Sequence, residues 1–328
     1  MCQEKIEVKM GKETKYSLPE DIVNSHPRVF PRYLISPFNT EYIEINHNLY
    51  VKHRTQGLKD SSLDKYFDDR KQYSYLTKRG QEGISMVLNH LNLKKQDEVC
   101  ILNTSGSPYL SSSVTSEIEK ICKWNRAINK KSKCIFVIHE FGFSANIPKE
   151  AVDSGLPIIE DCSYCLGSQN ENNSLGILGD YAIYSFSKMF PIPYGGFVRS
   201  KKKLSTRSNI TEYSRNYLLV LLLHYFKKQN IYLKTKQQNY NEFVKLMARH
   251  GIEPRFKLNK NNVPACFVFK LKQSALSDRL KIELNNKGIE STVYYGGDGF
   301  FVPSHQNLSS ADIEYIYKNI CQVLMLKS

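Results

Sequence analysis

The sequence of 328 residues contains no long apolar run and almost no tryptophan. Its longest apolar stretch, residues 217–226, is interrupted by His224, and it is much shorter than the roughly 20 residues of a membrane-spanning helix. The first residues, MCQEKIEVKMGKETK, contain no apolar segment of the kind found in a secretory signal. We therefore expect a soluble, cytoplasmic protein without a membrane partner.

The sequence also lacks internal repeats, low-complexity segments and the composition of a disordered chain. Apolar residues make up 41% and charged residues 24%, which is typical of globular domains. Trp124 is the single tryptophan, but the 21 tyrosines and 16 phenylalanines provide ample material for a core. The length allows one large domain and one smaller domain.

The charge is unbalanced, because 46 Lys and Arg against 32 Asp and Glu give a net charge of +14. Such an excess suits nucleic acid, a membrane surface or phosphorylated small molecules as partners, and it equally suits a lysine-rich surface in solvent. The densest cluster, residues 201–203, lacks the interleaved aromatic residues of a nucleic-acid-binding surface. We therefore expect no nucleic-acid partner.

Eight cysteines are present, and without a secretory signal they should remain reduced. Cys162 and Cys165 have Cys-x-x-Cys spacing. A zinc site would need a second such pair or two closely spaced histidines, and the sequence has neither. We therefore expect no metal site, and we expect the pair to pack beside the motif described below.

From residue 79 onward, short apolar segments alternate with helical patterns. One helix is predicted to begin at Gly80, with apolar residues at 84, 87, 88 and 91 along one face. Buried strands are predicted at residues 98–102, 134–138, 156–159, 181–186 and 196–198, with helices at 114–121 and near 151. Continuous apolar strands between helices are typical of a mostly parallel sheet covered on both faces, so the sequence predicts an α/β fold.

The two ends of the chain have other patterns. Residues 33–35 form a short apolar run, residues 37–40 favour a turn, and residues 42–53 have the alternation of a strand. Beyond residue 205 the sequence predicts long helices, strands at 265–271 and 290–295, a helix at 274–287 and a last helix from Ser309. We expect a large domain over residues 1–240 and a small α+β domain over residues 241–328.

Polar residues stand where a parallel sheet places its ligands, at the carboxyl ends of strands. One predicted strand ends at Glu160 and Asp161, and another leads into Ser185, Ser187 and Lys188. Gly80 and Gln81 open a helix, where backbone amides are free to bind a phosphate. Together they suit pyridoxal phosphate: the lysine can bond to its aldehyde, the aspartate can pair with its ring nitrogen, and the hydroxyls and amides can hold its phosphate.

Residues 155–198, GLPIIEDCSYCLGS…GILGDYAIYSFSKMFPIPYGGFV, resemble the core of the DegT/DnrJ/StrS sugar aminotransferases. The family's Glu-Asp-Ala-Ala-(Gln/His)-x-x-Gly segment is matched at residues 160–167, its Gly-x-x-Gly-Asp at 176–180 and its Gly-Gly at 195–196. Residues 138–142 resemble its Val-His-Leu-Tyr-Gly, and further similar motifs lie at residues 80–88, 97–99, 302–306 and 312–313. The order of the motifs, more than any one of them, carries the resemblance.

The resemblance implies a fold-type I enzyme dependent on pyridoxal phosphate, working as a homodimer. The implied reaction is amino transfer from an amino acid, expected to be glutamate, to a nucleotide-linked keto sugar in amino-sugar or cell-surface polysaccharide biosynthesis. Lys188 would hold the cofactor and then move the proton. The implied cofactor-binding residues are Asp161, Lys188, Tyr164, Ser185, Ser187, Gly80, Gln81 and Tyr109, the last as the ring-stacking aromatic.

Departures from the family pattern leave alternatives open. Tyr164 stands where the family has Gln or His, and its hydroxyl either contacts the cofactor or bonds to backbone within the core. His139, His305 and Arg215 are candidates for substrate contact, with a purely structural role as the alternative for each. The chain has no Gly-x-Asn-x-Arg segment after residue 200. Decarboxylation or elimination on an amino-acid-like substrate, or binding without catalysis, therefore remain as alternative functions.

Overall fold

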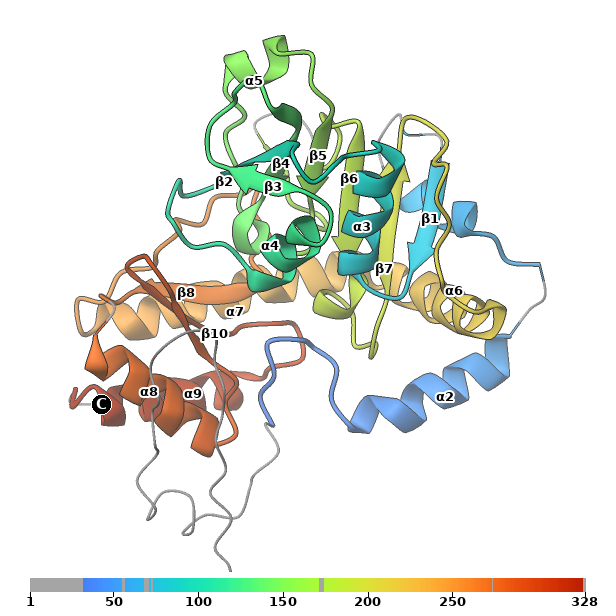
Figure 1. The fold of residues 1–328 in the computed structure, drawn as a ribbon. Coiled ribbons are helices and arrows are strands. Elements are labelled where there is room, and N and C mark those ends of the chain that lie inside the picture. The colour runs from blue at the N-terminus through green and yellow to red at the C-terminus, as the bar shows by residue number, and fades with distance from the viewer. Residues whose placement is uncertain are drawn as a thin grey trace, which may run out of the picture.

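A large mixed sheet and a small antiparallel sheet form the framework of the computed structural model shown in Figure 1. The structure describes residues 32–54, 57–67, 71, 73–170, 174–272 and 274–326. Among these residues, no helix combines the length and the apolar character that crossing a membrane requires.

The described strands of the large sheet are arranged in the order β1-β7-β6-β5-β4-β2-β3. Their bounds are β1 (Tyr73–Thr77), β2 (Glu98–Asn103), β3 (Lys123–Asn125), β4 (Ser132–Ile138), β5 (Ile158–Asp161), β6 (Tyr181–Ser185) and β7 (Gly196–Ser200). All neighbours from β6 to β3 pair in parallel, whereas β7 runs antiparallel to both β6 and β1. The carboxyl ends of β4, β5 and β6 therefore meet at one edge of the sheet.

Helices cover both faces of this sheet. On β4, Phe136 packs in the core beneath α3 (Gly80–His90) and α4 (Ser112–Glu119), while Ile135 packs with α5 (Lys149–Asp153). Because successive side chains of a strand point to opposite faces, these helices lie on opposite sides. On the α5 side, α6 (Glu212–Phe226) covers the other end of the sheet. A Cβ at Gly83 would lie 2.8 Å from Cγ2 of Val198, so this glycine lets α3 approach the sheet closely.

The C-terminal part forms a second core around the antiparallel sheet β8-β10-β9. Its elements are α7 (Gln229–Ala248), β8 (Cys266–Lys270), α8 (Ala275–Asn286), β9 (Thr292–Tyr294), β10 (Gly299–Pro303) and α9 (Ser310–Val323). Ser309 caps α9 by accepting a hydrogen bond from the backbone N–H of Asp312, whose carboxylate accepts the Ser309 N–H in return.

The predicted α/β fold class is confirmed, and the strands and helices predicted beyond residue 79 are present. The strand expected at residues 42–53 is wrong, because this segment forms helix α2 (Glu41–His53), which is followed by the 3-10 helix η1 (Asp60–Tyr66). Acidic residues begin α2 and basic residues end it, as the helix dipole favours. Its buried residues, Asn46 and Tyr50, lie four positions apart on one face.

The predicted division into two domains at residue 240 stays a prediction. This position lies inside α7, and Tyr240 and Phe243 pack in the core of the small sheet. Tyr33 packs in the same core, and it forms an isolated parallel bridge with Ile289. Tyr33, which precedes α2, therefore contributes to the packing of the C-terminal unit.

Candidate active site

A cavity of about 340 Å³ opens where β4, β5 and β6 end. Its volume is in the range of small-molecule sites, roughly 300–1,000 Å³. The cavity brings together most of the residues predicted from the sequence: Gly80, Gln81, Tyr109, His139, Asp161, Tyr164, Ser185, Ser187 and Lys188. The topology explains this grouping, because each residue follows a strand or opens a helix at the same edge of the sheet.

The N-terminus of α3 forms one wall of the cavity. Gly80 is the first residue of this helix, and a Cβ at this position would lie 3.5 Å from Oγ of Ser163 and 3.5 Å from Cβ of Ser185. The helix therefore begins against two serines that follow β5 and end β6. Free amides at a helix N-terminus together with hydroxyl groups provide donors for a phosphate.

Asp161 ends β5 and points its carboxylate toward the cavity from a buried position. One carboxylate oxygen accepts a hydrogen bond from the backbone N–H of Ser163 at 2.9 Å. Its carbonyl accepts from the backbone N–H of His139, at 3.3 Å. These bonds fix the orientation of Asp161 at the wall of the cavity.

Lys188 lies in the 3-10 turn η3 (Phe186–Lys188) directly after β6. The backbone N–H of Met189 closes this turn by donating to the carbonyl of Phe186. The amine nitrogen lies 4.2 Å from the centroid of the Tyr164 ring. Burial lowers the pKa of the Lys188 amine, and the nearby Asp161 carboxylate partly opposes this effect. A larger fraction of this amine is therefore neutral, as attack on a carbonyl carbon requires.

Tyr164 is half-buried between the cavity and the core of the small sheet. Burial raises the pKa of its hydroxyl well above the ordinary value, so the phenol remains protonated and able to donate a hydrogen bond. The Tyr164 ring also lies 5.8 Å from the ring of Phe141, which borders the same cavity. The predicted bond from this hydroxyl to a cofactor stays a prediction.

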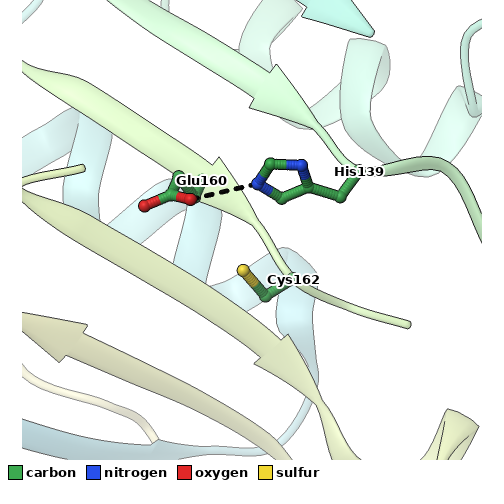
Figure 2. Close-up of side chains that lie close together, drawn as sticks. All are labelled: His139, Glu160 and Cys162. Atoms are coloured by element: carbon green, nitrogen blue, oxygen red, sulfur yellow. Dashed lines mark hydrogen bonds and ion pairs between the residues drawn. The ribbon is translucent and has the colours of Figure 1, made fainter. Parts of the chain in front are cut away.

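Figure 2 shows a buried cluster of His139, Glu160 and Cys162 beside this edge of the sheet. Nε2 of His139 lies 3.0 Å from Oε2 of Glu160, and Nδ1 accepts from the backbone N–H of Ala145 at 3.0 Å. Because Nδ1 accepts, Nε2 of His139 is the nitrogen that donates to Glu160. The carboxylate also accepts from the backbone N–H groups of residues 176 and 179. Both ring nitrogens of His139 therefore have partners within the protein. These bonds connect the end of β4 to Glu160 of β5 and to the backbone at Ala145.

The same cluster could in principle hold a metal ion, since its ligand atoms lie within 4.8 Å of one another. However, burial keeps the pKa of the Cys162 thiol well above its ordinary value, whereas a metal-binding cysteine must lose its proton. The bond to Glu160 occupies the remaining nitrogen of His139. These contacts account for the three residues without an ion, and the expectation that the protein has no metal site stays a prediction.

Two predicted substrate residues lie elsewhere. Both carboxylate oxygens of Asp60 in η1 accept from Nη1 of Arg215, and one of them also accepts from the backbone N–H of Leu76. His305 is 5% exposed, and burial lowers its pKa to about 3. Neither residue lines the cavity. Both residues have contacts within the fold, and their predicted contact with substrate stays a prediction.

Arg79, Glu140 and Tyr194 are among the residues lining the cavity for which the sequence alone predicted no role. Arg79 directly precedes α3. Its place next to Gly80 was a usable signal for an anion-binding side chain. Glu140 follows β4 within an apolar segment, and nothing in the local pattern indicates its contacts.

In this arrangement an aspartate ends one strand and a lysine follows its neighbour. The structure is similar to that of the aminotransferase TlmJ from Streptoalloteichus hindustanus, with a TM-score of 0.73 and 12% identity over 89% of this chain and 99% of that chain. It is also similar to NtdA from Bacillus subtilis, which was crystallised with bound cofactor PMP. The TM-score is 0.67 and the identity 15%, over 92% of this chain and 86% of that chain. These likenesses confirm the predicted fold.

The family match is more particular. Residues 118–203 match the model of the DegT/DnrJ/EryC1/StrS aminotransferase family. A GDP-perosamine synthase of Vibrio cholerae is 32% identical over 84 residues, which cover 24% of this chain and 23% of that relative. The aligned part thus spans less than a quarter of the relative's length. The resemblance predicted from the sequence is confirmed over this central segment, which contains Asp161 and Lys188.

Proposed function

We propose that the protein is a pyridoxal-phosphate-dependent aminotransferase that transfers an amino group from an amino acid to a nucleotide-linked keto sugar. One observation carries the proposal: Asp161, Lys188 and the N-terminus of α3 all face one cavity. The family match over residues 118–203 supports amino transfer, and the similarity to a GDP-perosamine synthase supports a sugar substrate.

The residues present fit this cofactor. The N-terminus of α3, where Gly80 lies close to Ser163 and Ser185, places amide and hydroxyl donors for a phosphate at the wall of the cavity. Gly80, Gln81, Ser185 and Ser187 would hold the phosphate. Asp161 would pair with the ring nitrogen, Tyr109 would cover the ring, and Lys188 would bond to the aldehyde.

Bound pyridoxal phosphate supplies an aldehyde that reacts with amines and a ring that accepts the electron pair released at the neighbouring carbon. Lys188 serves this chemistry because its amine, with a lowered pKa, can bond to a carbonyl carbon and later take up and return a proton. Asp161 would place a negative charge beside the ring nitrogen and thereby favour its protonated form. The bond from the Ser163 N–H holds that carboxylate in place.

The finer parts of the proposal come from the family resemblance. They are glutamate as donor, a homodimer, a cytoplasmic location and a role in amino-sugar or cell-surface polysaccharide biosynthesis. The large net positive charge, +14, suits an anionic nucleotide sugar. These parts are tested by substrate screening and by measuring the mass of the protein in solution.

The deciding experiment uses the purified chain with pyridoxal phosphate and L-glutamate. We expect a visible absorption band, a borohydride-reduced adduct that maps to Lys188, and release of 2-oxoglutarate as the bound cofactor gains the amino group. Keto sugars linked to nucleotides are then screened as acceptors, with Lys188→Ala as the control. A band without turnover of any amino donor would favour decarboxylation or elimination, and the absence of a band would favour binding without catalysis.

A further inference from the structure

Glu140 places a buried carboxylate at the wall of the cavity. It is 5% exposed, and it belongs to the short turn η2 (Glu140–Gly142) after β4. Oε1 accepts hydrogen bonds from the Tyr294 hydroxyl and, at 3.2 Å, from Nδ2 of Asn103, while Oε2 accepts from the backbone N–H of Ser105 at 2.6 Å. Both carboxylate oxygens are engaged within the protein, so this group is not arranged to accept a proton from a substrate.

The charge of Glu140 is compensated indirectly. The guanidinium of Arg126 donates to Oδ1 of Asn103, whose amide nitrogen donates to Glu140. One amide thus bridges a cation and an anion. A buried carboxylate is costly unless it is hydrogen-bonded, and these donors meet that requirement. The arrangement also fixes the segment between β2 and α4, because the same Asn103 nitrogen donates to the carbonyl of Tyr109 at 3.3 Å.

The Tyr294 side chain connects this carboxylate to the aromatic wall of the cavity. Its ring stacks on the ring of Tyr109, with centroids 4.3 Å apart and an interplanar angle of 25°. The hydroxyl groups of Ser105 and Ser107 lie 2.8 Å and 3.0 Å from the Tyr294 hydroxyl oxygen. Tyr294 therefore cannot rotate or shift without breaking bonds to three side chains, and Tyr109 packs against it.

We infer that Glu140 is a positioning residue, which holds the hydroxyl of Tyr294 and thereby sets the ring of Tyr109 at the cavity wall that would face the cofactor. The inference rests on the proposed function, because it concerns the cofactor ring. It concerns a departure of this chain, since residues 138–142 resemble a family motif that has leucine at this position. The hydrogen bond between Tyr294 and Glu140 joins β9 of the small sheet to the turn η2 at the cavity wall.

The test compares Tyr294→Phe, Glu140→Gln and the double variant in the full-length protein loaded with pyridoxal phosphate. Tyr294→Phe keeps the stacked ring and removes only the hydroxyl. The readouts are the cofactor dissociation constant and the visible circular dichroism per bound cofactor, which reports how the ring is held. We expect both single variants to lower the dichroism and to weaken cofactor binding about tenfold, as loss of a buried hydrogen bond to a charged group implies. If Glu140 acts through Tyr294, the double variant should lose no more cofactor affinity or dichroism than the more impaired of the two single variants.

Tyr240→Phe is the matched control. Its hydroxyl donates to the carbonyl of Phe256 in the same C-terminal core, and Tyr240 does not line the cavity. This variant should lower the melting temperature and leave the dichroism unchanged. Wild-type dichroism and affinity in Tyr294→Phe would overturn the inference, even if Glu140→Gln failed to fold. A wild-type protein that binds no cofactor would instead overturn the proposed function, and the inference with it.

Discussion

The amine nitrogen of Lys188 lies 4.2 Å from the centroid of the Tyr164 ring. An ammonium over an aromatic face is stabilised by the ring electrons, whereas burial disfavours the charged form of the same amine. Burial is the largest influence on Lys188, and its pKa is accordingly lowered. The Tyr164 ring therefore forms an apolar wall beside the amine. Burial keeps a larger fraction of this amine neutral and able to attack a carbonyl carbon.

The first prediction concerns Lys188→Ala. The variant should remain folded, because the side chain faces a cavity, and it should lose both the visible absorption band with pyridoxal phosphate and all amino transfer. Absorption spectra and borohydride reduction followed by peptide mapping measure the outcome. Lys201→Ala, at an exposed position after β7, serves as the control and should behave as wild type. A reducible adduct that persists in Lys188→Ala would show that another lysine holds the cofactor.

The second prediction concerns Asp161→Asn. The amide preserves the shape and the bond from Ser163 but removes the charge beside the ring nitrogen. The variant should bind the cofactor yet abstract the substrate proton more slowly by a factor of about one hundred or more, the rate equivalent of roughly 3 kcal/mol of lost electrostatic stabilisation. Single-turnover kinetics with glutamate measure this rate, and Asp153→Asn on the surface helix α5 is the control. Near-normal turnover in Asp161→Asn would refute the assignment.

The third prediction separates two roles of Tyr164. If its hydroxyl donates to the phenolic oxygen of the cofactor, Tyr164→Phe should shift the pH at which the visible band changes, with little loss of thermal stability. If the hydroxyl only satisfies backbone in the core, the variant should lose roughly 1–3 kcal/mol of stability, and the titration should stay in place. We expect the first outcome. A destabilised variant with an unshifted titration would remove Tyr164 from the cofactor site.

The central fold and most of the cavity could be predicted because their signals are local. The strands β2, β4, β5, β6 and β7 each contain a short apolar run, and parallel strands bring their carboxyl ends together wherever they lie in the chain. Asp161, Ser185 and Lys188 could therefore be assigned to one site from their places after strands. The strand predicted at residues 42–53 failed because a short alternation also fits an exposed helix with few buried residues, as α2 has.

The roles of Glu140 and Arg215 could not be predicted, because their partners are distant in sequence. Glu140 is bound by Tyr294, which lies 154 residues away, and Arg215 by Asp60, which lies 155 residues away. Only the completed fold brings these groups together. From the sequence alone, Arg215 was a candidate for binding an anionic substrate. In the structure its guanidinium pairs with Asp60 and holds η1 against α6.

Lys236 provides a last test, on stability. It lies on α7, is 4% exposed, and burial lowers its pKa to about 8, an effect that the neighbouring thiol of Cys266 partly opposes. In the unfolded chain this lysine has its ordinary pKa of about 10.4. Between these two values the unfolded state binds more protons than the folded state, so this residue makes the free energy of unfolding rise as the pH rises from 8 to 10.5.

The fourth prediction is that Lys236→Met raises the free energy of unfolding at neutral pH by about 3 kcal/mol. This value is the free-energy equivalent of lowering the pKa from 10.5 to about 8. The gain should be constant below pH 8 and should shrink as the pH rises from 8 to 10.5, because over this range the wild-type lysine is neutral in the folded state and protonated in the unfolded state. Urea denaturation at several pH values measures the difference between variant and wild type, in which the titration of the buried cysteines cancels. Lys245→Met, at an exposed position of the same helix, is the control and should change little at any pH. A Lys236→Met variant whose advantage does not depend on pH would show that the amine is charged in the folded protein throughout this range.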